Sequence, residues 1–100
     1  NVLASQAILD TLRGKKYILI YNSFKDKNYK EILNILKPII YHVEIIEVDD
    51  VRAEDIKKLE DVLRTLEIDF SLFEKISPDK KYLVFGSFSV VESFLKVYNG

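Results

Sequence analysis

Residues 17–28 read YILIYNSFKDKN, and this stretch decides the fold. Its first five residues form an apolar run rich in β-branched and aromatic side chains, which is typical of a strand covered on both faces in a parallel sheet. We therefore predict a strand at 16–22. The polar residues that follow lead into apolar positions at helical spacing from Tyr29 to Leu36, ahead of Pro38. The stretch is a strand, a loop and a helix in succession.

The same alternation continues on both sides of this unit. Upstream, apolar residues at helical spacing predict a first helix at 2–13, ended by Gly14. Downstream, the pattern predicts a strand at 42–48, a helix at 53–66, a strand at 81–85 and a last helical face from Val90 to Tyr98. Residues 67–80 are ambiguous: 68–70 fit a short edge strand, and 71–76 fit one or two helical turns.

This alternation predicts an α/β, Rossmann-like three-layer domain, with a mainly parallel sheet of about four strands and helices on both faces. The two most apolar strands, 16–22 and 81–85, are expected at the centre. Ligands of such sheets bind beyond the carboxyl ends of the strands. That rim here consists of residues 22–28, 49–52 and 86–89.

Composition narrows the class of protein. A chain of 100 residues forms one compact domain. Its 15 Lys and Arg nearly balance 16 Asp and Glu, which counts against binding to nucleic acid or an anionic membrane. With no cysteine and one histidine, a disulfide framework and a zinc site of Cys and His ligands are excluded. No apolar run approaches the roughly 20 residues that span a bilayer. We expect a cytoplasmic protein, and, because the chain opens directly into a helix without Met, a piece of a longer one.

Three stretches on the predicted rim resemble the C-terminal domain of folylpolyglutamate and dihydrofolate synthases, in the Mur-ligase superfamily. Residues 21–28 resemble the family's strand followed by Gly-x-x-x-Asp-Lys-Asp, with Asn22 in place of the glycine and Asn28 in place of the second aspartate. Residues 51–59 are similar to the family's Arg-Ala and following helix. Residues 84–91 are similar to its Gly-Ser-aromatic-x-Val-Val segment, the most specific of the three.

The start of the chain also fits the resemblance. Residues 1–4 align with the positions after the family's Asp-Gly-x-His hinge, so that Asn1 is the residue next to that histidine. The hinge Asp and His themselves are not in this chain. The resemblance therefore covers residues 1–100 as one ligase C-terminal domain.

The resemblance implies a two-domain ligase whose N-terminal domain, absent from this chain, binds ATP and Mg²⁺ and holds the folate pocket. ATP phosphorylates the carboxylate of dihydropteroate or a folyl glutamate, and the amine of L-glutamate attacks the acyl phosphate. The C-terminal domain closes over the nucleotide and helps to hold glutamate. This chain has no Gly-x-x-x-x-Gly-Lys-Ser/Thr segment. We expect the chain alone to be inactive, with no catalytic residue or metal ligand of its own.

The resemblance and the rim together select the candidate residues that face substrate or nucleotide: Asn1, Lys25, Asp26, Lys27, Arg52 and Ser87. Most of these residues also have a purely structural explanation. Asp26 and Ser87 each precede a helix and fit a helix cap. The two lysines fit solvated loop charges, and Arg52 fits a surface ion pair with Asp49 or Asp50. The single histidine, His42, is assigned a structural role.

A rival hypothesis treats the chain as a stand-alone α/β ligand-binding or receiver-like module. A receiver domain has an acidic cluster after its first strand, whereas this first strand ends in Tyr21-Asn22-Ser23. The parent reading frame distinguishes the two hypotheses. A long upstream region with a phosphate-binding loop favours the ligase, and a frame that begins near Asn1 removes it.

Overall fold

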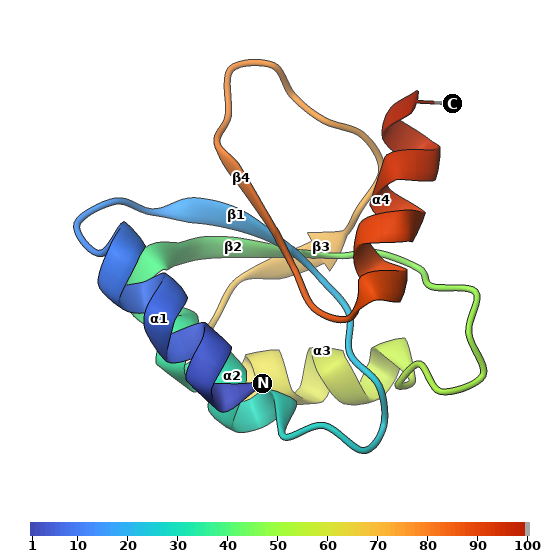
Figure 1. Ribbon diagram of the computed structural model, residues 1–100, viewed down its shortest axis with the longest axis horizontal. Coiled ribbons are helices and arrows are strands. Elements are labelled where there is room, and N and C mark those ends of the chain that lie inside the picture. The colour runs from blue at the N-terminus through green and yellow to red at the C-terminus, as the bar shows by residue number, and fades with distance from the viewer. Residues whose placement is uncertain (100) are drawn as a thin grey trace.

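Four parallel strands form the centre of the computed structural model, which describes residues 1–99 (Figure 1). They are β1 (Tyr17–Tyr21), β2 (Ile40–Ile45), β3 (Phe70–Leu72) and β4 (Tyr82–Phe85). Their order across the sheet is β3-β2-β1-β4, and every neighbouring pair is parallel. The predicted α/β class and the parallel sheet of four strands are confirmed.

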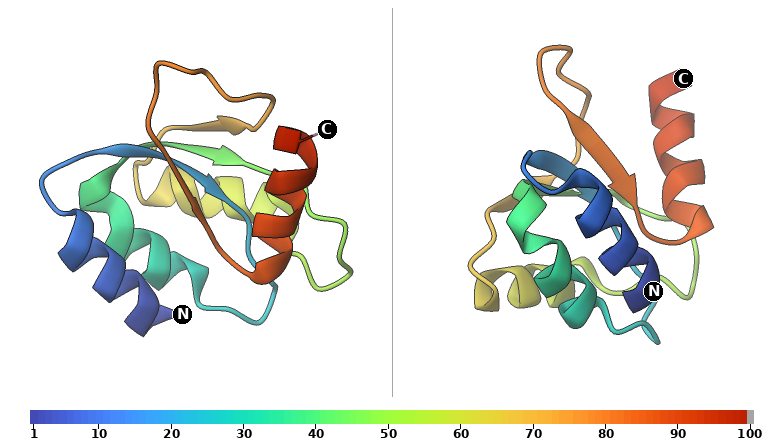
Figure 2. Two further views of the ribbon diagram at one scale, coloured as in Figure 1. Left: turned by 45° about the horizontal axis from the view of Figure 1, so that its top comes forward. Right: turned by 60° about the vertical axis from the view of Figure 1, so that its left-hand side comes forward.

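The helices cover both faces of the sheet, as predicted (Figure 2). On one face, α1 (Val2–Leu12), α2 (Tyr29–Leu36) and α3 (Ile56–Thr65) pack over the larger core. On the other face, α4 (Phe88–Asn99) packs through Val90 and Phe94. No helix within residues 1–99 is long and apolar enough to cross a membrane.

The strand order corrects one expectation. β1 is central, as predicted, but β4 lies at an edge and β2 takes the other central place. The sequence of β4 is apolar because both of its faces are covered: Leu83 and Phe85 pack on the larger core, and Tyr82 and Val84 on the smaller one. An apolar strand sequence therefore indicates that both faces of the strand are covered by other elements. It does not indicate whether the strand is central or at an edge of the sheet.

Two element boundaries also move, for local reasons. A 3₁₀ turn, η1 (Lys37–Ile39), contains Pro38 and feeds directly into the sheet, so β2 begins two residues before the predicted 42–48. The helix predicted at 53–66 begins only at Ile56. Residues 53 and 54 instead pair with the loop after β1. Ala53 forms an isolated antiparallel bridge with Phe24, and the backbone N–H of Glu54 donates to the carbonyl of Ser23 at 2.8 Å.

The segment between β3 and β4 contains no helix, so the helical turns considered for 71–76 are wrong. Residues 70–72 extend as β3, and residues 73–81 then cross to the opposite edge of the sheet. Phe73 and Ile76 pack against the smaller core, and the ring centroid of Phe73 lies 6.1 Å from that of Phe94 in α4. Two apolar side chains thus cover the area where a crossover helix would otherwise lie.

Candidate functional site

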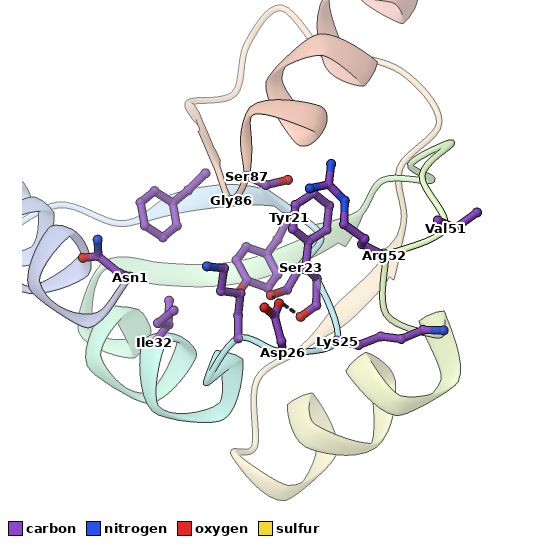
Figure 3. Close-up of a pocket in the computed structure, with 13 residues that line it drawn as sticks. Asn1, Tyr21, Ser23, Lys25, Asp26, Ile32, Val51, Arg52, Gly86 and Ser87 are labelled. Atoms are coloured by element: carbon purple, nitrogen blue, oxygen red, sulfur yellow. Dashed lines mark hydrogen bonds between the residues drawn. The ribbon is translucent and has the colours of Figure 1, made fainter.

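The carboxyl ends of β1 and β4 and the loop after β2 meet at a cavity of about 670 Å³ (Figure 3). Parallel strands that end at one edge of a sheet bring residues together that are far apart in sequence. The cavity is lined by all six candidate residues: Asn1, Lys25, Asp26, Lys27, Arg52 and Ser87. Their convergence is a finding of the structure, and their roles remain predictions.

Backbone hydrogen bonds fix the two loops that form most of the rim. The N–H of Lys25 donates to the carbonyl of Arg52 at 2.9 Å, beside the Phe24 to Ala53 bridge. These contacts extend strand-like pairing beyond the sheet itself. The β1–α2 loop and the β2–α3 loop therefore behave as one wall of the cavity.

Asn22, which stands where the family usually has glycine, joins the same two loops from inside. Its side chain is buried, with the residue 2% exposed. The amide Nδ2 donates to the carbonyl of Ile46 at 2.6 Å, and Oδ1 accepts from the N–H of Ser23 at 2.7 Å. Because both ends of the amide are used, this departure from the family pattern has a structural role at the end of β1.

Arg52 forms an ion pair with Asp50, which is one of the two partners expected for it from the sequence; Asp49 is not its partner. Its Nε lies 3.1 Å from Oδ1 of Asp50, and its Nη2 lies 2.8 Å from Oδ2. The Arg52 side chain and backbone N–H hold the pKa of the Asp50 carboxyl well below its usual range. The guanidinium Cζ also lies 4.4 Å from the ring centroid of Phe24. Arg52 is thus both a cavity residue and a paired residue.

Asp26 does not cap α2, so that structural expectation is wrong. Asn28 caps the helix instead: its Oδ1 accepts from the N–H of Glu31 at 3.4 Å, and its Nδ2 donates to the Glu31 carboxylate at 2.7 Å. The carboxylate of Asp26 remains among the side chains that line the cavity (Figure 3). The pKa of Arg52 is raised by Asp50 and, to a smaller extent, by the negative charge of Asp26.

Lys25, on the β1–α2 loop, lies at the side of the cavity next to α3. Figure 3 shows the Lys25 side chain extending away from the other labelled residues, toward α3. There, burial acts to raise the pKa of Glu54, but hydrogen bonds from Asp55 and Tyr29 and the nearby lysine charges, Lys25 included, bring that pKa below its usual value. Lys25 thus lines the cavity and also adds positive charge near Glu54.

Ser87 does not cap α4 with its side chain, which corrects the second cap expectation. The helix start is satisfied by the Ser87 carbonyl, which accepts from the N–H of Val90 at 3.0 Å. The hydroxyl Oγ is buried and has no hydrogen-bond partner within residues 1–99. An unpaired buried hydroxyl costs free energy. The unpaired hydroxyl lies at the N-terminal end of α4, the end of a helix that favours anionic groups.

Asn1 caps α1 and also lines the cavity. Its Oδ1 caps α1 by accepting from the N–H of Ala4 at 2.8 Å. The residue still lines the cavity, opposite Ser87 and Arg52 in Figure 3. The cap accounts for the oxygen of the amide and leaves the NH₂ group for other contacts.

Three aromatic residues that were not among the candidates also line the cavity: Tyr21 and Phe85, at the ends of the predicted strands 16–22 and 81–85, and Phe24. Burial raises the pKa of Tyr21 to about 12, so its hydroxyl stays neutral at physiological pH. Phe24 is the only aromatic residue in the polar 22–28 segment, which is the signal that could have found it. Within residues 1–99, no cluster of three or more His, Asp or Glu side chains is placed to hold a metal ion.

The cavity as a whole suits an anionic group. It combines basic side chains, a free hydroxyl and the N-terminal end of a twelve-residue helix, α4. Helix N-termini and Arg or Lys side chains favour carboxylates and phosphates. Acidic side chains at the rim, Asp26 and Asp50, offset part of this charge, so the preference depends on how each basic group is oriented.

No protein-family model matches the chain, and no curated protein matches it. Among solved structures, the crystal structure of Helicobacter pylori folylpolyglutamate synthetase is similar, with a TM-score of 0.95 and 37% sequence identity. The match covers 99% of this chain and 27% of that protein. The chain thus spans about a quarter of the length of its structural relative, and the family resemblance predicted from the rim motifs is confirmed.

Proposed function

We propose that this chain, a structural relative of the folylpolyglutamate synthetases, is the C-terminal domain of an ATP-dependent ligase of the Mur superfamily. The ligase adds L-glutamate to dihydropteroate, to folyl glutamates or to both. The observation that supports this most strongly is the convergence of all six candidate residues on one cavity, in a fold that matches a quarter of a folylpolyglutamate synthetase. The remaining part of the ligase holds the folate pocket and most of the ATP and Mg²⁺ site.

In this proposal the chain binds and orients, and the bond-forming groups come from the other domain. ATP phosphorylates the folate carboxylate and leaves as ADP, and the amine of glutamate then attacks the acyl phosphate and expels phosphate. The cavity closes on the catalytic domain and holds a carboxylate of the incoming glutamate. Ser87 Oγ and the N-terminal amides of α4 donate hydrogen bonds to it, and Arg52 supplies the neighbouring positive charge. Closure also excludes water from the acyl phosphate.

The test is a ligase assay on the full-length protein that carries this chain, with dihydropteroate and with tetrahydrofolate as separate substrates. Glutamate-dependent ADP release and incorporation of labelled glutamate are the two measurements. We expect turnover with at least one substrate and none by the 100-residue chain alone. Absence of turnover with both substrates, or ligation by the isolated chain, overturns the proposal.

Ser87→Ala in the full-length ligase should weaken the use of glutamate while leaving the fold intact. A lost hydrogen bond costs about 0.5–1.5 kcal/mol with a neutral partner and about 1.5–3 kcal/mol with a carboxylate, seen as a higher glutamate KM or a lower kcat. Stability should change little, because the hydroxyl has no partner within residues 1–99. Steady-state kinetics and thermal denaturation measure the two effects.

Ser5→Ala is the matched control for that variant. The Ser5 hydroxyl is buried in α1 and donates to the carbonyl of Val2 at 2.7 Å, and Ser5 does not line the cavity. Its loss should reduce stability and leave the glutamate KM unchanged. Unchanged kinetics for Ser87→Ala together with a large loss of stability would instead make Ser87 a structural residue.

A further inference from the structure

The guanidinium of Arg52 is held by only part of its hydrogen-bonding edge. An arginine side chain carries five N–H donors in a planar fork. Asp50 accepts from Nε at 3.1 Å and from Nη2 at 2.8 Å. These two bonds leave three N–H bonds, and one of Nη1 and one of Nη2 form the adjacent end edge of the fork. Phe24 lies against one face of the same plane, 4.4 Å from Cζ to the ring centroid.

Asp50 is the anchored partner of this pair. Its side chain is 16% exposed, whereas that of Arg52 is 67% exposed. Oδ1 also accepts from the backbone N–H of Arg52 at 2.9 Å, and Oδ2 accepts from the hydroxyl of Ser89 in α4 at 3.2 Å. The carboxylate therefore connects the β2–α3 loop with the first turn of α4. Because the carboxylate is fixed on two elements and the guanidinium is exposed, Asp50 sets the direction of Arg52.

We infer that Asp50 is a positioning residue that aims the free edge of the Arg52 guanidinium at a carboxylate or phosphate held in the cavity. This inference rests on the anion-binding role proposed above. The Nη1 and Nη2 edge of arginine matches the two oxygens of such a group, and a lysine cannot reproduce that fork. The same residue thus bonds to Asp50 with one edge and to the ligand with the other.

A purely electrostatic role and a positioning role of Asp50 predict opposite changes in anion affinity for Asp50→Asn. The direction of the change in Kd therefore distinguishes the two roles. Removing the negative charge of Asp50 makes the cavity more positive, and charge alone would strengthen anion binding. The asparagine also places an NH₂ group opposite a guanidinium N–H, so it releases Arg52 from its orientation. If Asp50 acts by positioning, the variant binds anions more weakly despite its added positive charge.

The experiment titrates the ¹⁵N-labelled chain with L-glutamate and, separately, with inorganic tripolyphosphate at constant ionic strength. The backbone signal of Ser87 and the Nε–H signal of Arg52 report binding and side-chain order. We expect Asp50→Asn to raise Kd for at least one anion by roughly 2- to 10-fold, the range for one hydrogen bond. We also expect it to broaden the Arg52 Nε–H signal, which a purely electrostatic role would not do.

Asp49→Asn is the matched control, because it removes the same charge from the neighbouring residue. The side chain of Asp49 is exposed, and the partner of Arg52 is Asp50. It should leave Kd unchanged or lower it. In an Arg52→Lys background no guanidinium remains to be oriented. There Asp50→Asn should lower Kd for the anion, the opposite of its effect when Arg52 is present. If Asp50→Asn binds as tightly as Asp49→Asn, the inference is overturned while the anion site stands. If the unmodified chain binds neither anion, both are overturned.

Discussion

Replacing Leu19 by alanine should lower the free energy of unfolding by about 2–5 kcal/mol, the usual cost of truncating a buried leucine. Leu19 is 0% exposed at the centre of β1. Its strand neighbours in register are Val43 in β2 and Leu83 in β4, and its side chain belongs to the larger core beneath α1, α2 and α3. Urea denaturation measures the loss, provided that the slope of the transition is unchanged.

Val84→Ala provides the comparison. Val84 pairs in register with Ile20 of β1, yet it lies in the edge strand and is only half-buried. The expected loss is about 1 kcal/mol, since each buried methylene contributes about 0.8 kcal/mol when fully covered. From the sequence both residues were expected in central strands, and both substitutions were expected to destabilise the domain. Equal losses would therefore contradict the observed strand order.

The sequence was sufficient for the repeating units of the fold, because each unit carries its own local pattern. The apolar run at 17–21 and the helical spacing from Tyr29 to Leu36 predicted β1 and α2 closely. The strand order was harder, since burial of both faces of β4 leaves the same pattern in an edge strand as in a central one. The segment 73–81 was also ambiguous, because the contacts of Phe73 and Ile76 depend on the path taken across the sheet.

At the site, motif resemblance selected the rim residues, and topology brought them together. Their hydrogen-bond partners could not be predicted in the same way. Asn28 and not Asp26 caps α2, although both precede the helix, because the loop places Asn28 at the cap position. Phe24 and Asp50 act on Arg52 from two different loops. Such pairings depend on loop conformation, for which a motif of spaced residues gives no direct signal.

Gly86→Ala should reduce stability by roughly 2–6 kcal/mol, the second large effect that the structure predicts. Gly86 has a φ of +145°, a region that L residues rarely adopt. A Cβ at this position would lie 2.7 Å from the carbonyl oxygen of Asn22 and 2.8 Å from Cγ2 of Val90. Backbone strain costs about 1–3 kcal/mol and overpacking a further 1–3 kcal/mol. The Asn22 oxygen belongs to the backbone beside β1, so it cannot move aside alone.

Gly14→Ala separates the two causes, because Gly14 has a φ of +99° and a Cβ added there would meet no atom within 4 Å in residues 1–99 beyond its chain neighbours. It should carry the strain of a positive φ without the overpacking, at about 1–3 kcal/mol. Gly86→Ala should also displace Ser87 and the first turn of α4, and so weaken anion binding in molecules that remain folded. Denaturation of both variants, with the tripolyphosphate titration repeated at a temperature where both are folded, measures these effects. Equal stability losses and unchanged anion binding in the two variants would contradict this prediction. The close approach of Gly86 to Asn22 would then not shape the cavity, and α4 alone would position the unpaired hydroxyl of Ser87.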